Sequence, residues 1–210
     1  MSKIFNIDRE PYNEGVQLYE KDSIEIFPGV TVLVGCNGAG KTTLLRSIEE
    51  QLEKENKPVF YYDNKTDGGE KAKGQALLQN NITLVATLVT SSEGEEIITN
   101  VGTLARTLGK FAKTNASEKE LFILLDAIDS GLSIDNIIAI KEHLFKTVIK
   151  YNPDKDVYII VSANSYEMAR EEDCFDVCKG EYCMFNNYMS YAEFIIKSAK
   201  AKEQRYPKEG

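Results

Sequence analysis

The stretch GVTVLVGCNGAGKTTLL, residues 29–45, decides the fold of this chain. Its first half is an aliphatic, β-branched run that suits a strand buried on both faces. Its second half carries Gly35, Gly40, Lys41 and Thr42 in the spacing G-x-x-x-x-G-K-[ST]. Between a buried strand and an amphipathic helix, such a loop cradles phosphate with backbone amides, and the helix dipole adds to the attraction. Lys41 is then expected to bridge β- and γ-phosphates, and the Thr42 hydroxyl to ligate Mg²⁺.

Outward from this stretch, strands and helices alternate along the chain. The hydrophobic pattern predicts strands at 3–8, 17–27, 57–64, 121–126 and 156–164, helices at 41–56, 95–111, 133–152 and 189–204, and a hairpin at 175–186. The polar segment 64–80 is expected to be a loop. This alternation predicts an α/β fold with a mostly parallel sheet flanked by helices and an antiparallel β portion at the N-terminal end. With 210 residues and 42% hydrophobic content, residues 1–210 are expected to form one domain.

Composition bounds the partners and the compartment. The formal net charge of −8 argues against a protein that coats nucleic acid, because such binding depends on Lys and Arg, although a local basic patch at 197–208 stays open. Residues 1–15 are charged where a signal peptide is apolar, and no long apolar run follows, so a cytoplasmic protein without membrane insertion is expected. Cys174, Cys178 and Cys183 lack paired C-x-x-C spacing, and the only histidine, His143, is distant. Free thiols are therefore expected rather than a zinc site.

A carboxylate should end another apolar strand, because the metal of a nucleotide site needs one. Asp126 closes LFILLD, residues 121–126, and fits that place. Thr42 and Asp126 together predict the Mg²⁺ site, so ATP and Mg²⁺ are the expected cofactors.

The loop GCNGAGKTTLL, with Asn37 and the doubled threonine, resembles that of ABC-type ATPases, including SMC-like and RecF-like heads. The resemblance implies a P-loop NTPase fold, and it covers nearly the whole chain. These heads carry a signature S-x-G-E where a helix starts, which Ser92-Glu93-Gly94-Glu95 matches. The family places this signature on the γ-phosphate of a second copy, which implies an ATP-dependent, head-to-tail homodimer with Ser92 and Gly94 acting in trans. The loop residues that the resemblance assigns to nucleotide binding are Asn37, Gly38, Gly40, Lys41, Thr42 and Thr43.

The segment between Lys41 and Ser92 is too short for the helical subdomain of transporter cassettes or the coiled-coil arm of SMC-like proteins. The resemblance thus implies a small stand-alone head with a minimal helical insertion at about residues 64–113. Gln75 and Gln79 both fall near the family glutamine that senses magnesium and water, and a polar helix surface explains either equally well. For adenine the candidate is Tyr12, with Tyr19 and Arg9 as alternatives.

Two positions depart from the family pattern. The residue after Asp126 should be the glutamate that polarises the attacking water, but it is Ala127, and the switch histidine would fall at Ala163 or Asn164. Loss of such a group costs about 10²–10⁴ in rate, so a weak ATPase is expected. Asp129 is a candidate replacement carboxylate, or else a turn residue that caps the segment 130–135. Ser162 and Asn164 are candidates for positioning the water.

Three functions are compatible with these residues. The first is a switch that dimerises on MgATP, hydrolyses it slowly and changes what it presents to an unknown protein partner. The second is a nucleotide-binding interaction module without hydrolysis, which the two alanines favour. The third is a P-loop kinase for a small molecule, which needs a lid with arginines, and residues 64–90 contain none.

Overall fold

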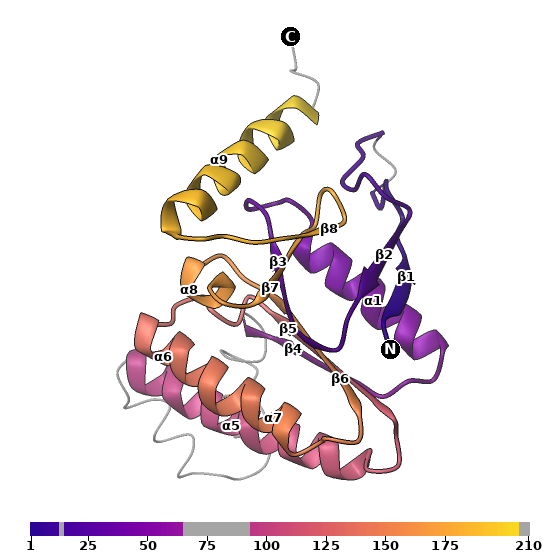
Figure 1. Ribbon diagram of the computed structural model, residues 1–210, viewed down its shortest axis with the longest axis vertical. Coiled ribbons are helices and arrows are strands. Elements are labelled where there is room, and N and C mark those ends of the chain that lie inside the picture. Colours follow the sequence, from indigo (N-terminus) through magenta and orange to yellow (C-terminus); the bar gives the residue numbers. More distant parts are fainter. Residues whose placement is uncertain (13–14, 65–92, 206–210) are drawn as a thin grey trace.

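The computed structural model of the chain describes residues 1–12, 15–64 and 93–205, and for residues 93–101 the backbone alone. The strands of the main sheet lie in the order β4-β5-β6-β3-β7-β8, and β1 and β2 form a separate antiparallel pair (Figure 1). The pairings among β4, β5, β6, β3 and β7 are parallel, and β8 runs antiparallel to β7. The strands are β1 (Lys3–Asn6), β2 (Ser23–Ile26), β3 (Gly29–Val34), β4 (Val59–Asp63), β5 (Glu120–Asp126), β6 (Asp156–Ser162), β7 (Asp173–Asp176) and β8 (Glu181–Cys183).

Helices cover both faces of this sheet. They are α1 (Lys41–Lys54), α5 (Glu93–Thr114), α6 (Ile134–Ala139), the π-helix η1 (Ile140–Phe145), α7 (Lys146–Lys150), α8 (Tyr166–Ala169) and α9 (Tyr188–Arg205). The predicted α/β architecture, with a mostly parallel sheet and a small antiparallel β portion, is confirmed.

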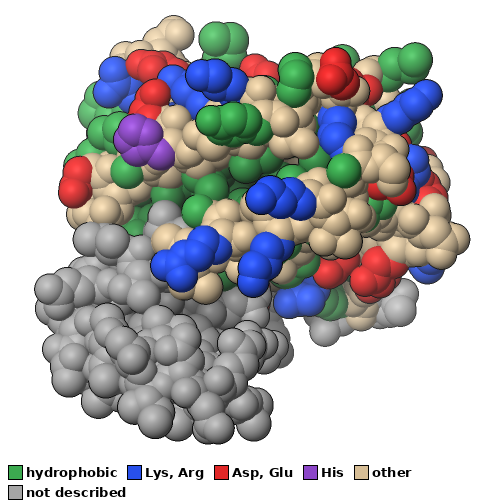
Figure 2. Space-filling view, turned by 90° about the horizontal axis from the view of Figure 1, so that it is seen from below, with side chains coloured by type: hydrophobic (Ala, Val, Ile, Leu, Met, Phe, Trp, Pro, Cys, Tyr) green, Lys and Arg blue, Asp and Glu red, His purple; other side chains and the backbone are tan. Residues whose placement is uncertain are grey.

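The central strands are apolar throughout because successive side chains enter two different cores. In β5, Phe122 and Leu124 join the core under α1, whereas Leu121, Ile123 and Leu125 join the core under α5 and the α6–η1–α7 helix. Figure 2 views the layer formed by α5 and the α6–η1–α7 helix, where hydrophobic side chains lie in a band between polar and charged ones. Two fully covered faces hold the parallel sheet rigid, and with it the strand ends that carry the site.

Several element boundaries differ from the prediction. Only Ser23–Ile26 of the expected strand 17–27 pairs with β1. Leu18 and Tyr19 are buried in the core but belong to no strand. The helix expected at 133–152 contains the π-helical segment η1, and the short helix α8 was not predicted. The loop expected at 64–80 lies, from residue 65 on, outside the described residues. None of the helices in the described ranges is long and apolar enough to cross a membrane.

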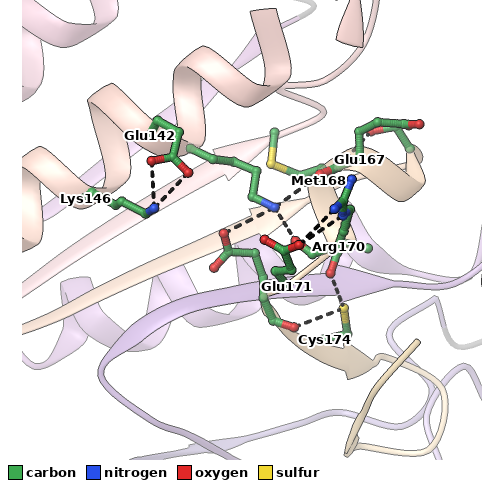
Figure 3. A network of polar contacts seen from close by, with 11 residues as sticks. Glu142, Lys146, Glu167, Met168, Arg170, Glu171 and Cys174 are labelled. Carbon is green, nitrogen blue, oxygen red and sulfur yellow. Dashed lines mark hydrogen bonds and ion pairs between the residues drawn. The ribbon is translucent and has the colours of Figure 1, made fainter. Parts of the chain in front are cut away.

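The π-helix supports α8, which follows β6 directly. Lys141 of η1 donates to the backbone carbonyls of Glu167 (3.2 Å) and Arg170 and forms an ion pair with Glu172 (3.3 Å), a network drawn in Figure 3. The Cys174 thiol donates to the Ala169 carbonyl (3.2 Å), and burial raises its pKa to about 12. This cysteine is therefore a protonated core residue beneath α8.

A fold prediction concerns the aromatic stack between β5 and β6. Phe122 is fully buried, and its ring centroid lies 4.7 Å from that of Tyr158. Phe122→Ala should lower the free energy of unfolding by about 3–5 kcal/mol, since it leaves a cavity and loses the stack. Urea denaturation would measure this, with Tyr151→Ala at a 78% exposed position as the control. Equal, small effects of both changes would contradict this account of the core.

Candidate nucleotide-binding site

The site lies at the carboxyl ends of three neighbouring parallel strands. β3 leads into the loop 35–40, β5 ends at Asp126, and β6 lies between β3 and β5. The end of β6 at Ser162 is therefore placed between the phosphate loop and the metal-site carboxylate. Ligands of open α/β sheets bind at such an edge.

The phosphate loop holds its lysine in a buried position. The Lys41 ammonium donates to the carbonyls of Gly35 (2.7 Å) and Cys36 (3.3 Å). Burial lowers the Lys41 pKa, and nearby charges, among them the carboxylates of Asp129 and Asp126, act in the opposite direction. The role predicted for this lysine requires it to exchange these two neutral carbonyl acceptors for charged phosphate oxygens, which form stronger hydrogen bonds with an ammonium.

Tyr19 fixes the point where the loop becomes helix α1. Gly40 precedes α1 with a left-handed φ of 100°, and its carbonyl accepts a hydrogen bond from the Tyr19 hydroxyl at 2.7 Å. Tyr19 is 5% exposed, so its ring is not open to a base. The alternative that Tyr19 stacks on adenine is therefore wrong.

Tyr12 lies at the start of α1 and is exposed. Its hydroxyl is 2.7 Å from the hydroxyl of Thr43, and the residue lies outside any strand. The other alternative, Arg9, is engaged by the Tyr19 carbonyl (3.3 Å) and the Gln17 side chain (2.8 Å). Tyr12 as the adenine contact stays a prediction.

Thr42 and Asp126, the predicted magnesium ligands, are in direct contact. The Thr42 hydroxyl donates to Oδ1 of Asp126 at 3.1 Å, although the two residues are far apart in sequence. Asp126 is buried and also accepts from Ser162 on Oδ1 and from the Tyr61 hydroxyl on Oδ2 (3.4 Å). A hydroxyl and a carboxylate oxygen side by side fit the preference of Mg²⁺ for hard oxygen ligands. Tyr61 was not predicted, because no motif marks a strand tyrosine.

A methyl group occupies the position of the expected catalytic glutamate, Ala127, and one of the two candidate positions of the switch histidine, Ala163. Ala127 adopts a left-handed φ of 52°, its amide donates to the Ser162 hydroxyl (2.9 Å), and its carbonyl accepts from Asn64 (3.2 Å). Ala163 is buried. Since Ser162 contacts Asp126 and the Ala127 amide, its hydroxyl fixes the Asp126 carboxylate relative to the turn that follows β5.

Asp129 clamps the turn that follows β6. Its Oδ2 accepts from the backbone amides of Asn164 (2.8 Å) and Ser165 (2.6 Å). Its Oδ1 is buried and has no hydrogen-bond partner among the described residues. Asp129 also lies in a turn, as the alternative expected, and its backbone carbonyl accepts from the Leu132 amide at 3.2 Å. Its side chain does not cap the segment 130–135 but bonds to the turn after β6. A buried carboxylate oxygen without a donor is costly unless it acquires one.

Part of the predicted site falls outside the described residues. Ser92, Gln75 and Gln79 lie in this undescribed part of the chain. α5 is helical from Glu93, where the described residues resume, and it includes Gly94. The predicted helix at 95–111 is confirmed, and the position of its start and the contacts of Ser92 and Gly94 stay a prediction.

Comparison with known families agrees with this geometry. A family model described as AAA domain matches residues 28–165, which include the phosphate loop, Asp126 and Asp129. The chain belongs to the AAA domain family. This AAA domain therefore has a P-loop NTPase fold, whose general function is nucleotide binding. No curated protein matches its sequence.

The contact between Gly40 and Tyr19 gives a prediction for this AAA domain. A Cβ on Gly40 would lie 2.8 Å from the Tyr19 oxygen and require a left-handed backbone, so Gly40→Ala should cost about 2 kcal/mol of stability. Gly109→Ala in α5, where a Cβ meets nothing within 4 Å, should instead stabilise the fold by up to about 1 kcal/mol. Thermal unfolding compares the two. Adding Tyr19→Phe should recover part of the Gly40→Ala loss, and unchanged stability of Gly40→Ala would contradict the contact.

Proposed function

We propose that this chain binds MgATP, forms an ATP-sandwiched head-to-tail homodimer and hydrolyses ATP slowly as a conformational switch. The observation that carries the proposal is the pairing of a complete phosphate and metal site with a buried carboxylate, Asp129, whose second oxygen has no donor. The proposal goes beyond nucleotide binding in naming the nucleotide, the dimer and the carboxylate.

MgATP binding is supported by the polar groups at the strand ends. Lys41 and the amides of the loop offer positive charge to the β- and γ-phosphates, and Thr42 and Asp126 would hold the metal. Bound Mg²⁺ would neutralise developing charge on the phosphates. The adenine would lie toward the exposed Tyr12 at the start of α1.

Hydrolysis would use Asp129 in place of the family glutamate. A water oxygen bonds to the γ-phosphorus, the bond from that phosphorus to the bridging oxygen breaks, and the water proton passes to the carboxylate. Asp129 suits this role because Oδ2 is fixed by two amides while Oδ1 is free to accept. Asp129 is close enough to Lys41 for its charge to raise the lysine pKa, against the lowering by burial.

The homodimer rests on the resemblance to ABC-type heads. That resemblance puts Ser92 and Gly94 at a helix start, where the helix N-terminus would offer amides and its dipole to the γ-phosphate of a second copy. An unknown protein partner would respond to the dimer. The net charge of −8 gives no support to nucleic acid as that partner.

A second candidate is a nucleotide-binding module without hydrolysis. The specific observation in its favour is that Ala127 and Ala163 both present methyl groups at the strand ends. The two candidates share every binding residue and differ only in the role of Asp129. A measurement of turnover therefore separates them.

Phosphate release from MgATP by concentrated protein tests the role of Asp129. Asp129→Asn keeps an oxygen for the amides of Asn164 and Ser165 but removes the base, so release should fall by about 10²–10⁴, the usual range for general-base help. MgATP affinity should stay within about twofold, because binding residues are untouched. Lys41→Ala is the blank that should bind no MgATP.

The outcomes distinguish the candidates. Release above the blank in the wild type that persists in Asp129→Asn would mean another group acts as base. Release equal to the blank, with MgATP bound, would favour the module without hydrolysis. Tight MgATP binding by Lys41→Ala would count against the whole site.

The dimer gives a separate prediction. Ser92→Arg should block MgATP-driven dimerisation while leaving nucleotide binding by the monomer nearly intact, because a bulky cation would stand where a second copy's γ-phosphate is expected. Light scattering on a size-exclusion column measures this, in an Asp129→Asn background that preserves the nucleotide. Ser91→Arg is the matched control and should still dimerise. Unchanged MgATP-driven dimerisation of Ser92→Arg would contradict the head-to-tail arrangement.

A further inference from the structure

The helix α9 contacts the nucleotide site at two separate places. It lies at the end of the molecule opposite the α5–α7 layer, close to the loop after β3 (Figure 1). Tyr191, Ser198 and Lys202 are spaced seven and four residues apart, so they share one helix face. Each of them has a backbone partner at the edge of the site.

The C-terminal half of α9 holds the phosphate loop. The Ser198 hydroxyl accepts from the Cys36 amide at 3.1 Å, and the Lys202 ammonium donates to the Asn37 carbonyl at 3.0 Å. Lys202 also covers Gly38, where a Cβ would lie 2.6 Å from its Nζ. Lys202 has no carboxylate partner within 4.0 Å in the described part of the chain. Within this part of the chain, the hydrogen bond of the Lys202 ammonium is therefore with the loop.

Two lysines thus share one short run of carbonyls. Lys41 donates to Gly35 and Cys36, and Lys202 donates to the next carbonyl, that of Asn37. When Lys41 turns to a bound phosphate, the Gly35 and Cys36 carbonyls lose this lysine, and the Cys36 carbonyl keeps the Ala39 amide at 3.1 Å. The contacts of α9 with Cys36 and Asn37 do not involve Lys41, so they can remain in place when it turns.

The N-terminal half of α9 holds the turn after β6. The Tyr191 hydroxyl donates to the Asn164 carbonyl at 2.9 Å, and the Asn164 amide in turn donates to Asp129. Tyr191 is buried against the rings of Tyr166 (5.8 Å between centroids) and Phe185 (5.2 Å). Burial raises the Tyr191 pKa, so this hydroxyl stays a proton donor at neutral pH.

We propose that α9 couples the phosphate loop to the turn after β6, whose amides hold Asp129, with Ser198 and Lys202 positioning the loop and Tyr191 positioning the turn. The proposal rests on the proposed function, whose carboxylate it positions. Tyr191 and Lys202 lie about 16 Å apart along a rigid helix, so a displacement of one end moves the other. Coupling of this kind is reciprocal: whatever binds at the loop alters the turn, and the reverse.

Matched variants at the two ends of α9 test the positioning roles. Lys202→Met should weaken MgATP affinity about five- to tenfold, whereas Lys200→Met, an exposed lysine on the same helix, should leave it unchanged. Lys202→Arg, which keeps charge and donor, should restore most of the affinity. Tyr191→Phe should hold affinity within about twofold and slow single-turnover phosphate release three- to tenfold, with the 60% exposed Tyr188→Phe as its control.

Hydrogen exchange at the amides of Asn164 and Ser165 measures the coupling between the phosphate loop and the turn after β6. Saturating MgATP should change their exchange in the wild type and in Lys200→Met, and this change should be largely lost in Lys202→Met. A purely structural role of Lys202 would lower thermal stability without removing the response. Identical affinity and response in Lys202→Met and Lys200→Met, with MgATP bound, would overturn the inference and leave the proposed function standing. Absence of MgATP binding by the wild type would overturn both.

Discussion

The parallel pairing of β3, β6 and β5 is the constraint on which the rest of this molecule depends. It brings the phosphate loop, the end of β6 and Asp126 to one edge of the sheet, so that the Thr42 hydroxyl reaches the Asp126 carboxylate at 3.1 Å. The pairing is held by two apolar cores that receive alternate side chains of the same strands. A rigid, doubly covered sheet fixes the site before any ligand arrives, so little ordering remains to oppose binding.

The site concentrates opposite charges in a buried space. Lys41 lies near Asp126 and Asp129, and all three side chains are at most 9% exposed. Buried charges are stable only when paired or hydrogen-bonded, and each has such support except at Oδ1 of Asp129. Ala127 and Ala163 carry no group that could accept a proton, whereas Asp129 has a carboxylate oxygen without a hydrogen-bond donor among the described residues. Asp129 is therefore the candidate base among these three residues.

The sequence predicted the local parts of this site well. The glycine loop, the start of α1 and the strand ending at Asp126 were read from short spacings, and each was confirmed. The extended strand at 17–27 was wrong, and Asp129 lies in the expected turn but its side chain does not cap the segment that follows. Tyr19 is apolar enough for a strand but packs under Gly40, and Asp129 is polar enough for a cap but finds amides at Asn164 and Ser165. In both cases a partner distant in sequence overrode the local preference.

Spacing within the chain alone determined that a phosphate loop follows a buried strand and that a carboxylate ends another. The resemblance to ABC-type heads added that two side chains expected in that family are absent. Only the tertiary structure decided which groups meet: Tyr61 and Ser162 at Asp126, Tyr19 at Gly40, and α9 at the loop and the β6 turn. The physical reason is the separation in sequence over which each interaction acts. Helix and strand periods act over a few residues, whereas the Ser198 hydroxyl meets the Cys36 amide across 162 positions, which only strand order and helix docking can arrange.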